Sequence, residues 1–114
     1  MIRKSVSIAS LAVMTVLFFT VSPMMTARAQ QPAAVEVKID NFSFGPQAQA
    51  VPVGTTVTWT NRDDIPHTVV STDGVFKSKV LDTDEKFSYT FAKAGTFAYF
   101  CSIHPKMTGK IVVQ

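Results

Sequence analysis

The sequence predicts an all-β domain of about seven short strands, arranged as a β-sandwich or a β-barrel. After Pro32, apolar and polar residues alternate with a period of two in several short stretches, as in strands with one buried face. Turn-forming glycine, proline, asparagine and aspartate residues separate these stretches. No segment beyond the first 29 residues has the periodicity of an amphipathic helix.

Three strands are predicted in the first half of this domain. In residues 35–40, three β-branched apolar residues alternate with three charged ones, and Gly45-Pro46 then breaks the pattern. A short stretch at 50–53 contains a proline, which favours an edge strand or a bulge because proline cannot donate to a ladder. Residues 55–60 alternate threonines with Val57 and Trp59, which indicates a central strand with two core side chains.

Four more strands are predicted in the second half. The β-branched run 67–70 follows a polar turn and ends before Asp73-Gly74. Aromatic residues alternate with polar ones in 86–91, and a second aromatic strand follows at 96–101. The last strand is predicted at 110–113. The aromatic side chains expected in the core are Phe42, Phe44, Trp59, Phe97 and Tyr99.

The N-terminus has the parts of a secretory signal peptide. Arg3 and Lys4 are followed by the apolar run 11–19, and Ala27-Arg28-Ala29 supplies small residues two apart before a cleavage site. We therefore expect a signal peptide at 1–29, a mature domain at 30–114 and a periplasmic location. An uncleaved membrane anchor is the alternative, but serine and threonine residues dilute the apolar segment.

The charge balance argues against nucleic acid as a partner. The chain has 11 Lys and Arg against 8 Asp and Glu, but Arg3, Lys4 and Arg28 belong to the predicted signal peptide. Residues 30–114 are therefore formally neutral, whereas nucleic-acid binding needs a basic surface. The single cysteine cannot form a disulfide within the chain, so it is a reactive thiol, a buried small side chain or a metal ligand.

Four residues in the mature region carry the candidate chemistry. Cys101, His104 and Met107 lie within seven residues, and His67 opens a predicted strand upstream. Each has an ordinary structural explanation when taken alone. A cysteine can be a small buried side chain, a histidine can lie on the surface or form a hydrogen bond, and a methionine can fill a gap in the core. Together they form the mixed nitrogen and sulfur set of a copper site with a His₂Cys plane and a weak axial Met, whereas Mg²⁺ or Ca²⁺ requires oxygen donors.

Residues 61–67 and 94–107 resemble the cupredoxins, and most closely the amicyanin type, whose short ligand loop has the spacing Cys-x-x-His-x-x-Met. The resemblance extends from about Val35 to Gln114. It implies a Greek-key β-sandwich of two sheets with one type 1 copper ion at one end. His67 corresponds to the buried histidine ligand, Cys101 to the thiolate, His104 to the histidine at the solvent edge and Met107 to the axial thioether.

The resemblance also implies an electron shuttle. Electrons would leave through His104, and brief docking would use an apolar patch around it, formed by Ile65, Pro66, Ile103 and Pro105. The partners expected are a dehydrogenase as donor and a c-type cytochrome or an oxidase as acceptor, with the protein itself a monomer. Two positions depart from the family pattern: Thr68 stands where many members have asparagine, and Lys106 adds a positive charge at the rim of the patch.

A copper carrier or storage protein is the alternative function. Copper carriers commonly use open sites that are rich in methionine or contain paired cysteines. Residues 30–114 contain only one methionine and one cysteine, which favours the shuttle. An enzyme is not expected. A Cys-His pair can form a nucleophile, but the sequence offers neither a third orienting residue at a recognisable spacing nor an oxyanion-hole motif.

Overall fold

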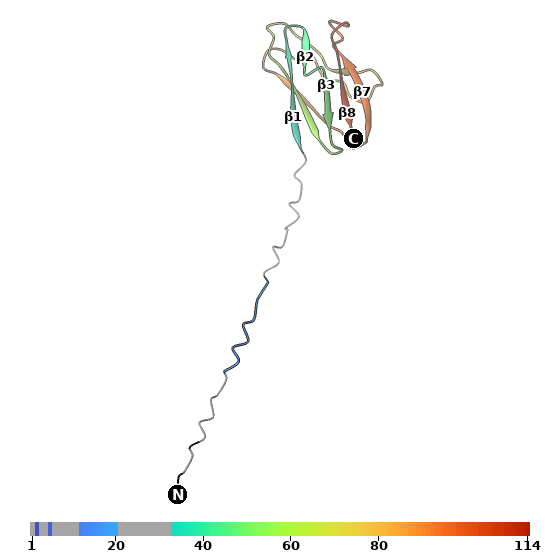
Figure 1. Ribbon diagram of the computed structural model, residues 1–114. Helices are drawn as coiled ribbons and strands as arrows, with labels where there is room; N and C mark the ends of the chain where they lie inside the picture. The colour runs from blue at the N-terminus through green and yellow to red at the C-terminus, as the bar shows by residue number, and fades with distance from the viewer. Residues whose placement is uncertain (1, 3–4, 6–11, 21–32) are drawn as a thin grey trace.

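The computed structural model describes residues 2, 5, 12–20 and 33–114, and residues 33–114 form the folded domain. Figure 1 shows this domain as two layers of strands. The strands are β1 (Ala34–Asp40), β2 (Ser43–Gly45), β3 (Ala48–Val51), β4 (Thr56–Asn61), β5 (Val70–Ser71), β6 (Lys86–Thr90), β7 (Gly95–Phe100) and β8 (Thr108–Val113).

The strands form two mixed sheets of four. One sheet has the order β2-β1-β4-β6 and the other β3-β8-β7-β5. The pairs β1–β4 and β3–β8 are parallel, and the remaining pairs are antiparallel. The chain crosses from one sheet to the other after β2 and after each strand from β3 to β6. The predicted all-β sandwich of two sheets is therefore confirmed, with one strand more than expected.

The alternating strands bury one face each, as the sequence predicts. In β1, Val37 and Ile39 are fully buried while their charged neighbours are exposed, and in β4 Val57 and Trp59 are fully buried. Val37 lies opposite Trp59 in the parallel register of these two strands. Full burial of such side chains stabilises the fold by about 1.5–3 kcal/mol each, which explains why the register is strongly specified.

Trp59 lies at the centre of an aromatic core. Its ring packs against Phe76, Phe91 and Tyr99 at centroid distances of 5.5, 6.5 and 5.4 Å. Phe97 packs against this core with part of its ring exposed. Core positions were thus predicted correctly for Trp59, Phe44, Tyr99 and, in part, Phe97.

Phe42 is not a core residue. Its side chain is 48% exposed, so the prediction of a buried Phe42 is wrong. The cause is the short strand β2, which the sequence analysis did not predict: β1 and β2 form a hairpin in which Asp40 lies opposite Ser43. Phe42 therefore lies in the turn of this hairpin rather than on a strand.

The predicted strand at 67–70 is also shorter than expected. Only Val70 and Ser71 form β5, whereas His67 makes an isolated bridge to Leu81. The reason is that this segment changes its pairing partner. His67 pairs with Leu81, whereas Val70 pairs with β7. This change of partner leaves His67 fully buried but outside both four-stranded sheets.

The predicted signal peptide lies mostly outside the described residues, and so does its cleavage site at Ala29. Residues 12–20 form neither a helix nor a strand. The part of the chain that the structure describes contains no helix of the length and apolarity needed to span a membrane.

Candidate metal centre

Three of the predicted ligands converge at one end of the sandwich. The donor atoms offered by His67, Cys101 and His104 all lie within 4.8 Å of one another. Nδ1 of His67 is 3.7 Å from Sγ of Cys101, and Nδ1 of His104 is 3.8 Å from the same sulfur. Both imidazoles thus turn the same type of nitrogen toward one buried thiol.

The loop from Cys101 to Met107 is closed by its own backbone. The amide of Cys101 donates to the carbonyl of Met107 at 3.0 Å, and the amide of Met107 donates to the carbonyl of His104 at 2.9 Å. Met107 is therefore brought back beside Cys101, and its side chain is only 5% exposed. The structure thus gathers all four sequence-predicted ligands, three on one loop and His67 opposite.

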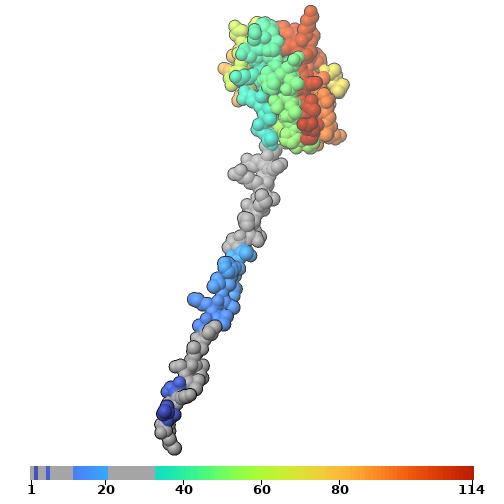
Figure 2. Space-filling model, in the orientation of Figure 1, coloured from blue at the N-terminus to red at the C-terminus, as the bar shows by residue number. Residues whose placement is uncertain are grey.

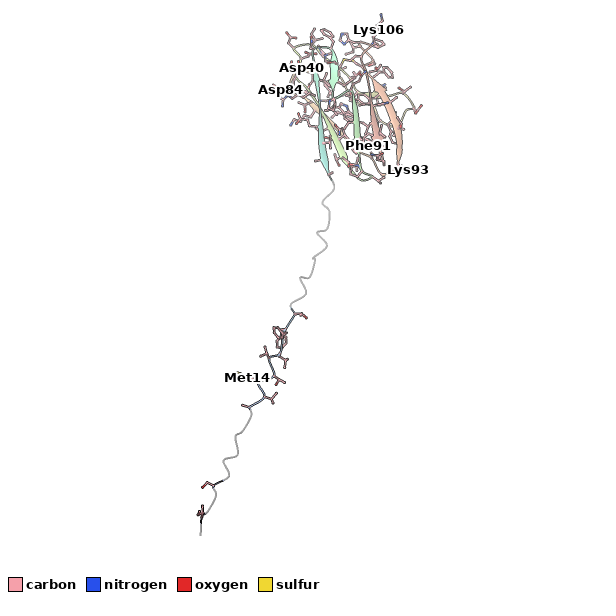
Figure 3. The ribbon with its side chains drawn as sticks, viewed as in Figure 1. Met14, Asp40, Asp84, Phe91, Lys93 and Lys106 are labelled. Atoms are coloured by element: carbon pink, nitrogen blue, oxygen red, sulfur yellow. The ribbon has the colours of Figure 1, made fainter. Side chains whose placement is uncertain are left out.

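Figure 3 shows where this loop lies. Lys106, within the loop, is at one end of the domain, while Phe91 and Lys93 are at the other. In Figure 2 the segment that contains this loop, coloured orange-red, protrudes from the domain. The loop is therefore accessible to a partner although Cys101 is fully buried.

His67 is fixed from both its backbone and its ring. Its backbone exchanges hydrogen bonds with Leu81 at 3.1 and 2.8 Å. Its ring is fully buried, and Nε2 lies 2.8 Å from Oδ2 of Asp63. The ionised carboxylate of Asp63 accepts, so Nε2 of His67 carries a proton, and Nδ1 is the ring nitrogen that faces Cys101. This hydrogen bond fixes the orientation of the ring, as the carboxylate partner of a metal-binding imidazole does.

Asp63 is a site residue that the sequence analysis missed. Besides the ring of His67, its carboxylate accepts the backbone N–H groups of Asn41 and Phe42 at 2.8 and 3.0 Å. Partial burial raises the pKa of Asp63, but these hydrogen bonds and the contact with His67 lower that pKa below its ordinary value overall. The available sequence signal was its position four residues before a candidate ligand.

Thr68 ties the two ligand-bearing segments together. Its Oγ1 accepts the N–H of Ser102 at 2.7 Å and lies 2.7 Å from Oγ of the same residue. Its own N–H points at Sγ of Cys101, 3.4 Å away. A threonine hydroxyl is thus long enough to link the segment of His67 to the segment of Cys101.

The surroundings of Cys101 favour its thiolate. Burial raises the pKa of this thiol, but the N–H of Thr68 and the groups of His67 and His104 more than offset burial and lower the pKa to about 6. At neutral pH the sulfur is therefore largely ionised, which is the form that binds metals.

The donor set fits copper. A thiolate, two imidazole Nδ1 atoms and a thioether are the soft and intermediate donors of a trigonal copper site with a weak axial ligand. The carboxylate of Asp63 forms a hydrogen bond with Nε2 of His67, whereas the sulfur of Cys101 faces Nδ1 of the same ring. Asp63 therefore supports a ligand instead of adding the oxygen donor that Mg²⁺ or Ca²⁺ needs.

Apolar residues around the loop are exposed. Ile65 is 36% and Ile103 46% exposed, and Pro66 and Pro105 are also exposed. Phe42 adds an exposed ring that packs edge-on against His104, with ring centroids 5.1 Å apart. His104 itself is half-buried, so it lies between the buried thiol and this surface.

Known proteins are similar to this chain in sequence. The family model of the cupredoxin-like domain matches residues 8–113. The chain is 38% identical to amicyanin from Paracoccus denitrificans over 98 residues, 82% of this chain and 74% of that protein. It is 37% identical to amicyanin-alpha from Methylorubrum extorquens over 86 residues, 71% of this chain and 72% of that protein.

Solved structures of cupredoxins are similar to this chain in fold. A methionine-to-alanine variant of amicyanin in its Cu(I) form superposes with a TM-score of 0.68 at 37% identity, covering 71% of this chain and 82% of that one. A purple cupredoxin from Nitrosopumilus maritimus superposes with a TM-score of 0.66 at 34% identity, covering 70% of this chain and 99% of that one. The sequence match, the two-sheet sandwich and the converging donors lead to one conclusion: this chain belongs to the cupredoxin-like domain family.

Proposed function

We propose that this chain is an exported single-electron carrier in which His67, Cys101, His104 and Met107 hold one type 1 copper ion. Copper bound there supplies reversible one-electron chemistry by alternating between Cu(I) and Cu(II). The observation that carries the proposal is the convergence of two Nδ1 atoms on the sulfur of a fully buried cysteine, with all three donors within 4.8 Å.

The protein holds these donors in place through its own hydrogen bonds. His67 is fixed by Leu81 and Asp63, and the loop is closed between Cys101 and Met107. These contacts join protein atoms to one another, so the same geometry is available to both oxidation states. Preorganisation of this kind favours rapid electron transfer, because little has to rearrange at each step.

His104 is the proposed exit for the electron. It is the more exposed of the two histidines, and the apolar side chains of Ile65, Ile103 and Phe42 are exposed on the segments around it. A small apolar surface suits the brief docking of redox partners. The partners we propose are a dehydrogenase as donor and a c-type cytochrome or an oxidase as acceptor, with the carrier itself a monomer.

A visible and electron paramagnetic resonance spectrum of the Cu(II)-loaded protein tests this function. We expect an intense blue thiolate-to-copper band with narrow copper hyperfine splitting, and its loss in Cys101→Ala. A pale spectrum with ordinary hyperfine splitting would show that Cys101 is not a ligand and would favour the copper carrier. A spectrum unchanged in Cys101→Ala would likewise contradict the proposal.

Export is tested separately. We propose that the signal peptide is removed after Ala29 and that the domain works in the periplasm, because the first 29 residues have the charge, the apolar run and the small residues of a secretory signal. Cell fractionation with mass spectrometry of the isolated protein should give a chain that begins at Gln30. A full-length chain in the membrane fraction would instead support the anchor.

A further inference from the structure

The turn between β1 and β2 has an unusual conformation. It contains two residues, and both have positive φ angles: 50° at Asn41 and 55° at Phe42. Two-residue hairpins of this kind prefer asparagine followed by glycine, because glycine adopts a positive φ without steric cost. Asn41 fits the first position, whereas a bulky phenylalanine in the second is strained. Some other contact must hold Phe42 there.

Asp63 supplies this contact. Oδ1 accepts the N–H of Asn41 at 2.8 Å, and Oδ2 accepts the N–H of Phe42 at 3.0 Å. The same Oδ2 accepts the Nε2 proton of His67 at 2.8 Å. The side chain of Asp63 is only 11% exposed, so water does not compete freely for these hydrogen bonds. One carboxylate thus joins a strained turn to the ring of a predicted ligand.

The strained turn presents its aromatic ring to the site. Phe42 packs edge-on against His67, with centroids 5.7 Å apart and planes at 87°. It packs in the same way against His104, at 5.1 Å and 90°. A single ring therefore contacts both imidazoles, and its position depends on the turn that Asp63 holds.

We propose that Asp63 is a positioning residue of the metal centre, which locks the Asn41–Phe42 turn to His67 and thereby holds the Phe42 ring against both imidazoles. The inference rests on the proposed copper site but goes beyond its ligands. It has two measurable consequences. The turn amides are protected, and the carboxylate stabilises the more positive oxidised state, because its negative charge is hydrogen-bonded to a ligand.

The first test measures amide hydrogen exchange by NMR in the metal-free protein. We expect the N–H groups of Asn41 and Phe42 to be protected in the wild type. In Asp63→Asn, one oxygen becomes an NH₂ group that cannot accept, so we expect at least one of these amides to exchange about tenfold faster, as one lost hydrogen bond implies. Unprotected turn amides in the wild type would overturn the proposal whether or not the variant folds.

The second test measures the reduction potential of the copper-loaded protein. Asp63→Asn should raise the potential, because a negative charge beside the oxidised ion is lost. Asp64→Asn is the matched control: it removes the same charge from the next residue, which is exposed and takes no part in these hydrogen bonds. Asp63→Glu should restore most of the wild-type potential. Equal shifts in Asp63→Asn and Asp64→Asn would overturn the proposal.

The two tests also separate this inference from the proposed function. A pale Cu(II) spectrum of the wild type would refute the electron carrier. The exchange measurement needs no copper, so it would still decide whether Asp63 holds the turn. A blue spectrum with unprotected turn amides would have the opposite meaning. It would support the electron carrier and refute the positioning role of Asp63.

Discussion

Thr68 and Ser102 connect the two segments that bear the predicted ligands. Oγ1 of Thr68 accepts the N–H of Ser102, and the two hydroxyl oxygens lie 2.7 Å apart. Since Thr68 follows His67 and Ser102 follows Cys101, this contact fixes the distance between the histidine and the thiol. Thr68 is 5% exposed, so its hydroxyl is well shielded from water.

Replacement of Thr68 by valine tests this link. Valine keeps the shape of threonine but cannot accept the N–H of Ser102, so we expect the free energy of unfolding to fall by about 1 kcal/mol. Chemical denaturation of the metal-free protein measures the change. Thr68→Ser keeps the hydroxyl and serves as the control. If the valine variant were as stable as the serine variant, the hydroxyl would not be the connecting group.

Replacement of Met107 by glutamine tests the proposed axial ligand. Met107 is buried at the end of the closed loop, and an amide oxygen is a harder donor than a thioether. We expect Met107→Gln to retain copper and to lower the reduction potential, because a harder donor stabilises Cu(II) over Cu(I). Voltammetry of the loaded variant measures this shift. An unchanged potential would remove Met107 from the coordination sphere.

The fold was predictable wherever a strand is long enough to show alternation. The stretches 35–40 and 86–91 correspond closely to β1 and β6, because each contains several repeats of the two-residue pattern. The strands β2 and β5 have three and two residues. So short a strand has almost no period, and its pairing depends on partners elsewhere in the chain.

The sequence predicted which residues converge at the candidate site, but not which residues support them. His67, Cys101, His104 and Met107 belong to residue types that are rare in residues 30–114, so their spacing stands out. Asp63 is one of several aspartates, and its amide partners lie 22 and 21 residues away. Only the folded hairpin brings those amides to the carboxylate, so no local pattern could have predicted the contact.

Gly109 provides a test of the packing beneath the ligand loop. A Cβ at this position would lie 2.5 Å from Cζ and from the hydroxyl of Tyr99, whose ring is 1% exposed. We expect Gly109→Ala to lower the free energy of unfolding by about 1–3 kcal/mol, the usual cost of overpacking a core.

Thermal or chemical denaturation measures this effect, and two further variants interpret it. Gly45→Ala is the control, since a Cβ there would meet only the carbonyl oxygen of Lys38 at 3.9 Å. Adding Tyr99→Phe to Gly109→Ala removes one of the two closest atoms and should recover part of the lost stability. Equal stability of Gly109→Ala and the wild type would show that the Tyr99 ring can move aside.

The thiol of Cys101 should titrate at an unusually low pH in the metal-free protein. Burial opposes ionisation, but the N–H of Thr68 and the two imidazoles lower the pKa to about 6, against about 8.5 for an ordinary cysteine. Between these two values the unfolded chain binds more protons than the folded one, so the free energy of unfolding should rise with pH from about 6 to 8.5. Below pH 6 this contribution is lost as the folded thiolate is protonated.

Thiolate absorbance in the ultraviolet gives the titration, and denaturation at several pH values gives the stability. Cys101→Ala should lack both the absorbance change and the rise in stability over this range. The variant keeps His67 and His104, so the difference from the wild type isolates the contribution of the thiol. A wild-type thiol that titrates near 8.5 would mean that the hydrogen bonds around Cys101 do not stabilise its anion.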